Sequence, residues 1–164
     1  MPLNILYSKP GHLIRRAHQI AVALFMEECA SWDITPVQYA TLVAIKETPG
    51  IAAIQLSAIV AFDPATLGKV IERLEAKKLV SRRTTATDKR AKCSFLTKEG
   101  QELVEAIEPA VMRSQERILA PLGAKDRKTF VRLLDQMVET NNHASRAPRR
   151  PMRSTTRRRP AKTA

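Results

Sequence analysis

The chain has 164 residues, enough for one domain with a hydrophobic core, and its formal net charge of +12 is typical of proteins that bind nucleic acid or anionic surfaces. Two cysteines 64 positions apart exclude a disulfide framework and a cysteine-based zinc site. No signal-peptide pattern is visible and the longest apolar run is far too short to cross a bilayer, so we expect a cytoplasmic protein with no membrane partner.

The first two helices are predicted from apolar periodicity and from helix-start signals. Residues 11–31 carry apolar side chains at helical spacing from Leu13 to Phe25, which gives a wide apolar face. A second helix is expected to begin at Thr35-Pro36, an N-cap residue followed by a first-turn proline, and to end before the next Thr-Pro-Gly sequence.

The middle of the chain predicts two short helices joined by a tight turn. The first is expected over about 53–60, and the second from Pro64 to about Lys78 with Asp63 as its N-cap residue. The sequences LVSRRT and CSFLT then predict two strands around a charged loop. Two helices followed by a hairpin indicate a winged helix-turn-helix, over about 35–97.

The helical period returns from Thr97 onward. A long helix continues past Pro109, where we expect a kink, and a last helix is expected over about 124–141. The predicted fold class is therefore mainly α with a small β-hairpin wing. The terminal helices, at about 10–31 and 97–142, have broad apolar faces that the small middle unit cannot cover, so we expect them to dimerise with a second copy.

The charge is unevenly distributed along the chain. Residues 53–96 carry an excess of five positive charges, whereas the segments on either side of them, up to residue 145, are close to balance. Residues 146–164 hold seven arginines, one lysine and no acidic residue. Because this last segment has almost no apolar side chains, we expect a single domain over 1–145 followed by a disordered Arg-rich tail that adds affinity for phosphates.

The helix that begins at Pro64 has an outward face suited to reading DNA. Its apolar residues from Leu67 to Leu74 are expected to face the core. The residues left facing outward are Ala65, Thr66, Lys69 and Arg73. Threonine and lysine can bind bases or phosphates, and the alanine methyl can meet a thymine methyl. On a lone helix this face would more often be solvated, but here it adjoins a basic hairpin.

The hairpin supplies a second set of charged candidates. Arg90 at its tip is expected to enter the narrow minor groove, where negative potential is concentrated. Asp88 is expected to orient Arg90 through a charge-assisted hydrogen bond. The residues expected to meet phosphates are Arg82, Arg83, Lys89 and Lys92. A charged hairpin loop on its own is usually only solvated.

Two stretches resemble the MarR family of bacterial transcriptional regulators. DKRAKCSFLTKEG resembles its wing signature, which is Asp-x-Arg, a short apolar strand and Leu-Thr-x-x-Gly. FDPATLGKVIERLEAKKLVSRR resembles its recognition helix and first wing strand, and the helix order matches over roughly 10–142. The resemblance implies a homodimer that binds a pseudo-palindromic operator in double-stranded DNA, often as a repressor, with Asp88 and Arg90 at the wing tip.

The chain departs from the family pattern at two positions. Lys78 stands where the family usually has a glycine before the Leu-Val strand, which predicts that this helix end is closed differently. Gly68 stands where serine or threonine is common, so one possible DNA contact is absent. Gly68 also allows close approach to DNA or to a neighbouring helix.

The resemblance further implies release from DNA by a small aromatic or phenolic acid, bound between the dimerisation helices and the winged unit. The first helix has two polar stripes in which arginine accompanies histidine, a combination suited to holding a carboxylate. These stripes consist of His12, Arg16 and Gln19, and of Arg15 and His18. Ring contacts are expected from Trp32, Tyr39 and Phe62. Solvent-facing or dimer-contact roles for these residues remain the alternative.

Three other functions compete with this interpretation. Redox control through Cys29 is disfavoured because two neighbouring glutamates oppose a thiolate, and Cys93 falls in a strand expected to be buried. An enzyme is not expected, nor a cofactor or metal, because the three histidines follow no catalytic order and no Gly-rich phosphate loop is present. A non-specific architectural nucleic-acid-binding protein is the better rival, and it would lack an operator preference of ~10³ or more.

Overall fold

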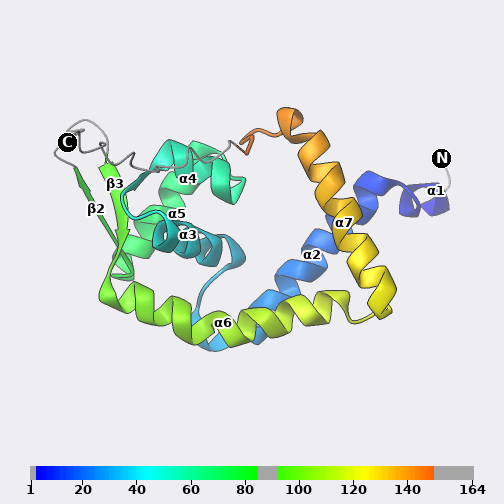
Figure 1. Ribbon diagram of the computed structural model, residues 1–164, viewed down its shortest axis with the longest axis horizontal. Coiled ribbons are helices and arrows are strands. Elements are labelled where there is room, and N and C mark those ends of the chain that lie inside the picture. Colours follow the sequence, from blue (N-terminus) through cyan, green and yellow to red (C-terminus); the bar gives the residue numbers. More distant parts are fainter. Residues whose placement is uncertain (1–2, 85–91, 150–164) are drawn as a thin grey trace, which may run out of the picture.

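The computed structural model describes residues 3–84 and 92–149 and shows a mainly helical chain with one small antiparallel sheet (Figure 1). In chain order the elements are α1 (Leu3–Tyr7), α2 (Pro10–Glu28), η1 (Ala30–Trp32), α3 (Pro36–Glu47), β1 (Ile51–Ala52), α4 (Ala53–Val60), α5 (Pro64–Ala76), β2 (Val80–Thr84), β3 (Lys92–Leu96), α6 (Lys98–Leu119), α7 (Ala124–Thr140) and η2 (Asn142–Ala144). The predicted fold class, mainly α with a β-hairpin wing, is confirmed.

The winged helix-turn-helix forms one half of the protomer, where α3, α4 and α5 gather beside the sheet (Figure 1). The strand order is β1-β3-β2, with both neighbours antiparallel to β3. The hairpin strands β2 and β3 were expected. The two-residue strand β1 was not, because it is too short to show a period, and its pairing with Ser94 and Cys93 is a long-range contact.

Capping side chains fix where the helices of this unit begin. The Thr35 hydroxyl accepts the backbone N–H of Gln38 at 3.3 Å, and the Gln38 side chain accepts the N–H of Thr35 at 2.9 Å. A carboxylate oxygen of Asp63 accepts the N–H of Thr66 at 2.9 Å, so α5 starts at Pro64 as predicted. Such caps each contribute about 1 kcal/mol.

The end of α5 corrects the expectation for Lys78. Its φ of 59° lies in the left-handed region that favours glycine. The N–H of Lys78 donates to the carbonyl of Glu75 at 2.8 Å, and that of Leu79 donates to Leu74 at 3.0 Å. The helix is therefore closed in the way a glycine would close it, and a lysine adopts this conformation at a cost of about 1 kcal/mol.

The Leu-Thr-x-x-Gly sequence joins the wing to the end of α5. The Thr97 hydroxyl accepts the N–H of Gly100 at 3.0 Å and donates to the carbonyl of Lys78 at 2.7 Å. Gly100 packs directly on Leu79, because a Cβ at Gly100 would lie 2.1 Å from the Leu79 carbonyl oxygen. The start of α6 therefore packs directly on Leu79, the first residue after the turn that ends α5.

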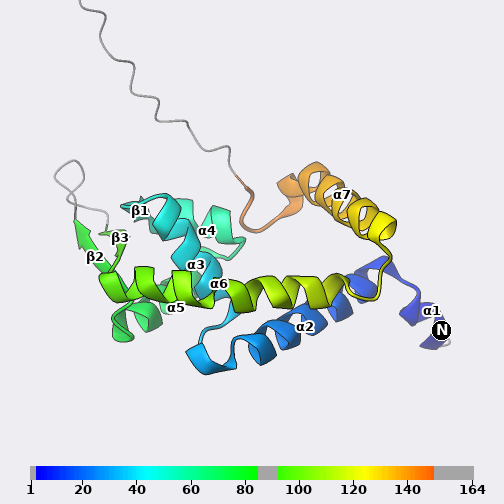
Figure 2. The ribbon, with the colours of Figure 1, turned by 60° about the horizontal axis from the view of Figure 1, so that its bottom comes forward.

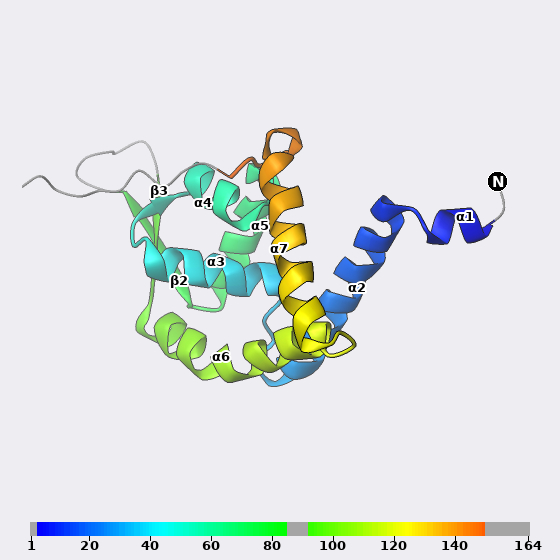
Figure 3. The same ribbon diagram turned by 45° about the vertical axis from the view of Figure 1, so that its right-hand side comes forward.

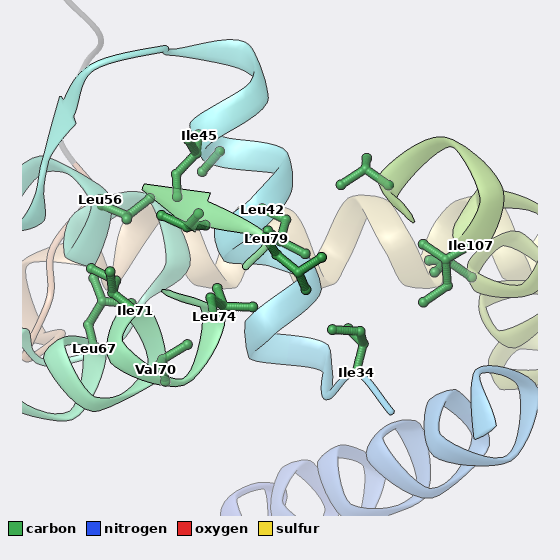
Figure 4. Packing of buried hydrophobic residues seen from close by; sticks show 14 of the residues in the cluster. Ile34, Leu42, Ile45, Leu56, Leu67, Val70, Ile71, Leu74, Leu79 and Ile107 are labelled. Carbon is green, nitrogen blue, oxygen red and sulfur yellow. The ribbon is translucent and has the colours of Figure 1, made fainter. Parts of the chain in front are cut away.

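The hydrophobic core lies between α3, α4, α5 and the sheet, and Figure 4 shows its side chains pointing toward one another. The fully buried members from these helices are Leu42, Ile45, Leu56, Leu67, Ile71 and Leu74. Burial of each such side chain contributes roughly 1.5–3 kcal/mol. Phe25 of α2 and Ile107 of α6 extend the cluster toward the long helices.

The long helices α2 and α6 pack against each other, and Figure 2 shows α6 running past the winged unit and alongside α2. Glu28 accepts from Arg113 and Arg117, each at 2.9 Å, and Glu27 pairs with Arg117 at 2.8 Å. Helix α6 continues through Pro109. Within residues 3–84 and 92–149 no single helix has the length and apolar content to cross a membrane. Only α4 and α5 taken together meet both criteria, and these two helices are bent by 101° relative to each other.

Helix α7 turns back from the far end of α6 toward α4 (Figures 1 and 3) and has no buried residue. After it, the Asn142 side chain donates to the carbonyl of Arg149 at 2.9 Å and accepts the N–H of Arg149 at 2.7 Å. Arg149 also pairs with Glu139 at 2.7 Å, and Ala147 is buried. The predicted tail therefore differs in its first residues, since 146–149 pack at the end of α7. Residues 150–164 lie outside the described part.

Candidate DNA-binding surface and effector site

The outward face of α5 is the one expected from the sequence. Leu67, Val70, Ile71 and Leu74 are buried. Ala65, Thr66, Lys69 and Arg73 are exposed. The helix therefore presents two cations and two small side chains to solvent along one face, beside the wing. This is the arrangement that a recognition helix needs in order to enter a major groove.

An ionised carboxylate holds the N-terminal end of this helix. Hydrogen bonds from the Thr66 side chain and then from its backbone N–H lower the pKa of Asp63. Asp63 consequently stays charged at neutral pH and complements the positive end of the α5 dipole.

The wing strands use their arginines for two different purposes. Arg82 is half-buried and is bound by Glu75 of α5, with Nη2 2.5 Å from Oε2 and its backbone N–H donating to Oε1 at 3.1 Å. The Arg83 guanidinium instead lies over the Phe95 ring, 4.1 Å from its centroid. Arg82 thus ties the wing to the recognition helix, a role that the sequence did not indicate.

Of the remaining candidate DNA contacts on the wing, the structure describes only Lys92. Lys92 is exposed at the start of β3. The predicted tip residues Asp88, Lys89 and Arg90 lie outside the described ranges, so their arrangement stays a prediction.

The predicted effector-binding residues form two separate groups within one protomer. The first group lies on the N-terminal half of α2 and consists of His12, Arg15, Arg16, His18 and Gln19. Its members are exposed except His12, which is half-buried with its ring centroid 5.7 Å from that of Tyr7. Tyr7 was not foreseen as a neighbour, because α1 was not predicted.

The second group, Trp32, Tyr39 and Phe62, is half-buried against the core. Tyr39 lies beside Phe25, with 6.0 Å between ring centroids. Phe25 follows His12 by thirteen positions on the same helix, which separates them by about 20 Å. His12, at the start of the first group, is therefore well separated from Tyr39 within one protomer.

Neither cysteine is placed to form a reactive thiolate. The Cys29 side chain is buried, and its pKa is raised by this burial and by the charge of Glu28. Cys93 is buried on β3. Reactive cysteines usually lie in exposed, electropositive surroundings with a lowered pKa, so both positions match the structural role expected from the sequence.

The protein has a winged helix-turn-helix whose basic helix faces outward, and long helices with uncovered apolar faces. These features are those of the winged-helix DNA-binding regulators. Residues 32–91 match the profile of the MarR family. The transcriptional repressor NicR of Pseudomonas putida is 30% identical over 134 residues, which cover 82% of this chain and 85% of NicR. This chain therefore belongs to the MarR family of transcriptional regulators, as the sequence resemblance indicated.

Solved structures of the family have the same fold. BpsR of Bordetella bronchiseptica, studied for the regulation of its DNA binding by 6-hydroxynicotinic acid, is 31% identical; the match covers 80% of this chain and 94% of BpsR with a TM-score of 0.76. A MarR variant of Escherichia coli complexed with operator DNA is 25% identical; the match covers 84% of this chain and 99% of that protein with a TM-score of 0.77.

Proposed function

We propose that this protein is a repressor that binds a pseudo-palindromic operator as a homodimer and is released from it by a small aromatic carboxylic acid. The observation that carries the proposal is the exposed basic face of α5 beside the wing, on a protomer whose α7 apolar face is left uncovered. The first feature supplies DNA contacts, and the second supplies a reason for two copies to associate.

The DNA contacts follow from the placement of the cations. Lys69 and Arg73 on α5 would lie in the major groove, where they can donate to guanine or to phosphate. Arg83 and Lys92 on the wing strands would meet the backbone, and Arg90 oriented by Asp88 would enter the minor groove. A two-fold axis would place two α5 helices about 34 Å apart, on successive turns of the same face of the duplex.

The homodimer is supported by the exposed apolar side chains of the terminal helices. On α7 these are Phe130, Val131, Leu133, Leu134, Met137 and Val138, and on α2 they include Leu13, Ile14 and Ile20. A contiguous apolar stripe of this kind on a monomer marks an interaction surface. The simplest complementary surface is the same stripe on a second copy.

The effector site would be completed across the dimer. Along α2 the rise from Phe25, which lies beside Tyr39, is about 20 Å to His12 and about 15 Å to Arg15, so these two side chains and the ring of Tyr39 would not enclose one small ligand within one protomer. Figure 3 shows α1 and the start of α2 extending away from the rest of the protomer, where a partner can be met. An aromatic carboxylate is the ligand class, because 6-hydroxynicotinic acid regulates DNA binding by the similar protein BpsR.

Selection from a random duplex pool at physiological salt tests the DNA part of the proposal. We expect enrichment of an inverted repeat with half-sites about one helical turn apart. Lys69→Ala and Arg73→Ala should each weaken binding to that repeat, whereas the matched charge removal Lys125→Ala on α7 should not. Binding without any enriched sequence would favour the architectural alternative, for which the Arg-rich tail is the supporting observation.

Calorimetry with a panel of aromatic carboxylic acids tests the effector part. At least one acid should bind the dimer and weaken operator binding, and Arg15→Ala or Arg16→Ala should reduce its affinity. A panel in which no acid binds would contradict the effector class while leaving operator recognition intact.

A further inference from the structure

The chain after α7 forms a closed loop that ends at Arg149, the last described residue. The side chain of Asn142 holds both backbone groups of Arg149, because it donates to the carbonyl at 2.9 Å and accepts the N–H at 2.7 Å. The Arg149 guanidinium pairs with Glu139 of α7 at 2.7 Å, and Ala147 within the loop is buried. The point from which residues 150–164 continue is therefore fixed relative to α7.

This loop lies beside the turn of the helix-turn-helix. An open groove of about 1150 Å³ separates them, and it is lined by Ala58, Ile59 and Ala61 on one side and by loop residues that include Arg149 on the other. Ala65 on the outward face of α5 follows Ala61 by four positions, which span at most about 14 Å. The last described residue is thus close to the end of the recognition helix that reaches base edges in this motif.

The loop and the wing lie on opposite sides of α4. Figures 1, 2 and 3 all show the hairpin strands β2 and β3 on one side of α4 and the orange end of α7 on the other. The wing is proposed to enter one minor groove beside the recognition helix. A segment that starts at Arg149 would approach the DNA from the side that the wing does not cover.

The composition of residues 150–164 suits a minor groove. They include five arginines and one lysine with no acidic residue, and residues 157–159 are three consecutive arginines. A·T-rich segments have a narrow minor groove whose enhanced negative potential attracts arginine. Basic arms of other DNA-binding folds enter the minor groove next to the major groove that their helix reads. Fifteen residues span at most about 50 Å, which is enough to reach a neighbouring groove from Arg149.

We propose that residues 150–164 act as a minor-groove arm that reads an A·T-rich segment beside each half-site, and that Asn142 is the positioning residue that aims this arm. The inference rests on the proposed DNA-binding function and adds a sequence preference to the phosphate affinity expected of the tail. Helix α5 would read the inverted repeat, and the arm would read the base pairs next to it. The MarR profile matches residues 32–91, so this second preference does not follow from membership of the family.

Selection from a random duplex pool at physiological salt tests the arm by comparing the full chain with a chain that ends at Arg149. Both proteins should enrich the same inverted repeat, but only the full chain should enrich A·T pairs beside the half-sites. In direct titration, replacement of these A·T pairs by G·C pairs should weaken binding by the full chain about tenfold and binding by the shortened chain less than twofold.

Asn142→Ala tests the positioning role. Release of residues 142–149 lengthens the tether from 15 to 23 residues, which roughly halves the effective concentration of the arm at the DNA, so the A·T preference should fall about twofold or more. The matched control is Asn141→Ala, whose side chain donates to the Met137 carbonyl of α7 at 2.8 Å, and it should keep the full preference. In the chain that ends at Arg149 neither substitution should change DNA binding, whereas a purely structural effect of Asn142→Ala would persist there.

Several results would overturn the arm. Identical flanking sequences selected by the full and the shortened chain would do so. A salt slope that falls on shortening without any change in flanking preference would mean that the tail binds phosphates without reading sequence. An A·T preference that the shortened chain keeps and Arg90→Ala loses would assign it to the wing. An unchanged preference in Asn142→Ala would refute the positioning role. Failure of both chains to select an inverted repeat concerns α5 and would refute the proposed function instead, so the two failures are distinguishable.

Discussion

Replacing Leu134 with aspartate tests the proposed dimer interface at the centre of the apolar face of α7. Leu134 is 40% exposed in the protomer, and its apolar neighbours on the same helix face are Phe130, Val131, Met137 and Val138. Because α7 has no buried residue, the substitution leaves the core of the protomer untouched. We therefore expect Leu134→Asp to fold and to fail to dimerise.

The size of the effect follows from the exposed fraction. Complete burial of a leucine contributes about 1.5–3 kcal/mol, so burial of the remaining two-fifths contributes roughly 1 kcal/mol. In a two-fold symmetric dimer this loss occurs twice, and each aspartate must also be removed from water, which costs a few kcal/mol more unless it is paired. A total of about 4 kcal/mol or more raises the dimer dissociation constant by roughly 10³-fold.

Sedimentation at micromolar concentration measures the dimer, and operator titration at the same concentration measures its consequence. The matched control is Gln136→Asp, which adds the same charge on the opposite face of the same helix turn. Helical content by circular dichroism should be preserved in both variants. If Leu134→Asp remains a dimer and binds the operator as tightly as Gln136→Asp, the apolar face of α7 is not the interface.

Three further outcomes are expected. Lys78→Gly should stabilise the protein by about 1 kcal/mol because φ is 59° there, whereas Ala76→Gly, at the last residue of α5, should not stabilise it, as measured by urea unfolding at one protein concentration. Arg113 and Arg117 lower the pKa of Glu28 from its ordinary value of 4.5, so its stabilising contribution is present above that pH and is lost as the pH falls through the lower folded pKa. Glu28→Gln should therefore lose part of the wild-type pH dependence below about 4.5, and an unchanged acid profile would contradict this reading. Removal of the residues after Arg149 takes away five arginines and one lysine, so the slope of log K against log salt should fall by up to about five per protomer, with the preferred inverted repeat retained. An unchanged slope would mean that the tail does not contact DNA.

The parts of the fold that were predictable from the sequence are those set by local signals. Asp63-Pro64 and Thr35-Pro36 fix the helix starts through hydrogen bonds within four residues, and the structure contains both caps. The outward face of α5 follows from the helical period alone. The wing strands were predictable because turn residues lie at their ends and the helical spacing of apolar residues stops before them.

The parts that were not predictable depend on contacts between distant segments. Strand β1 exists only through its pairing with β3, more than forty residues away. The ion pair between Glu75 and Arg82 requires the chain to reverse at Lys78. The reversal was predicted, but the way the helix closes there was misjudged because lysine rarely takes a positive φ. The candidate effector residues on α2 could be named from chemistry, but their convergence in the proposed dimer depends on a second chain.

Control of DNA binding by an effector requires a physical link between α2 and α5, because a ligand shifts affinity only by favouring one arrangement of the two. Helix α6 supplies such a link. Arg113 and Arg117 tie it to the end of α2, and Gly100 seats its other end on Leu79, directly after the closure of α5. Because the start of α6 lies in direct contact with Leu79, a displacement of α2 that moves α6 would reach the base of the recognition helix through this contact.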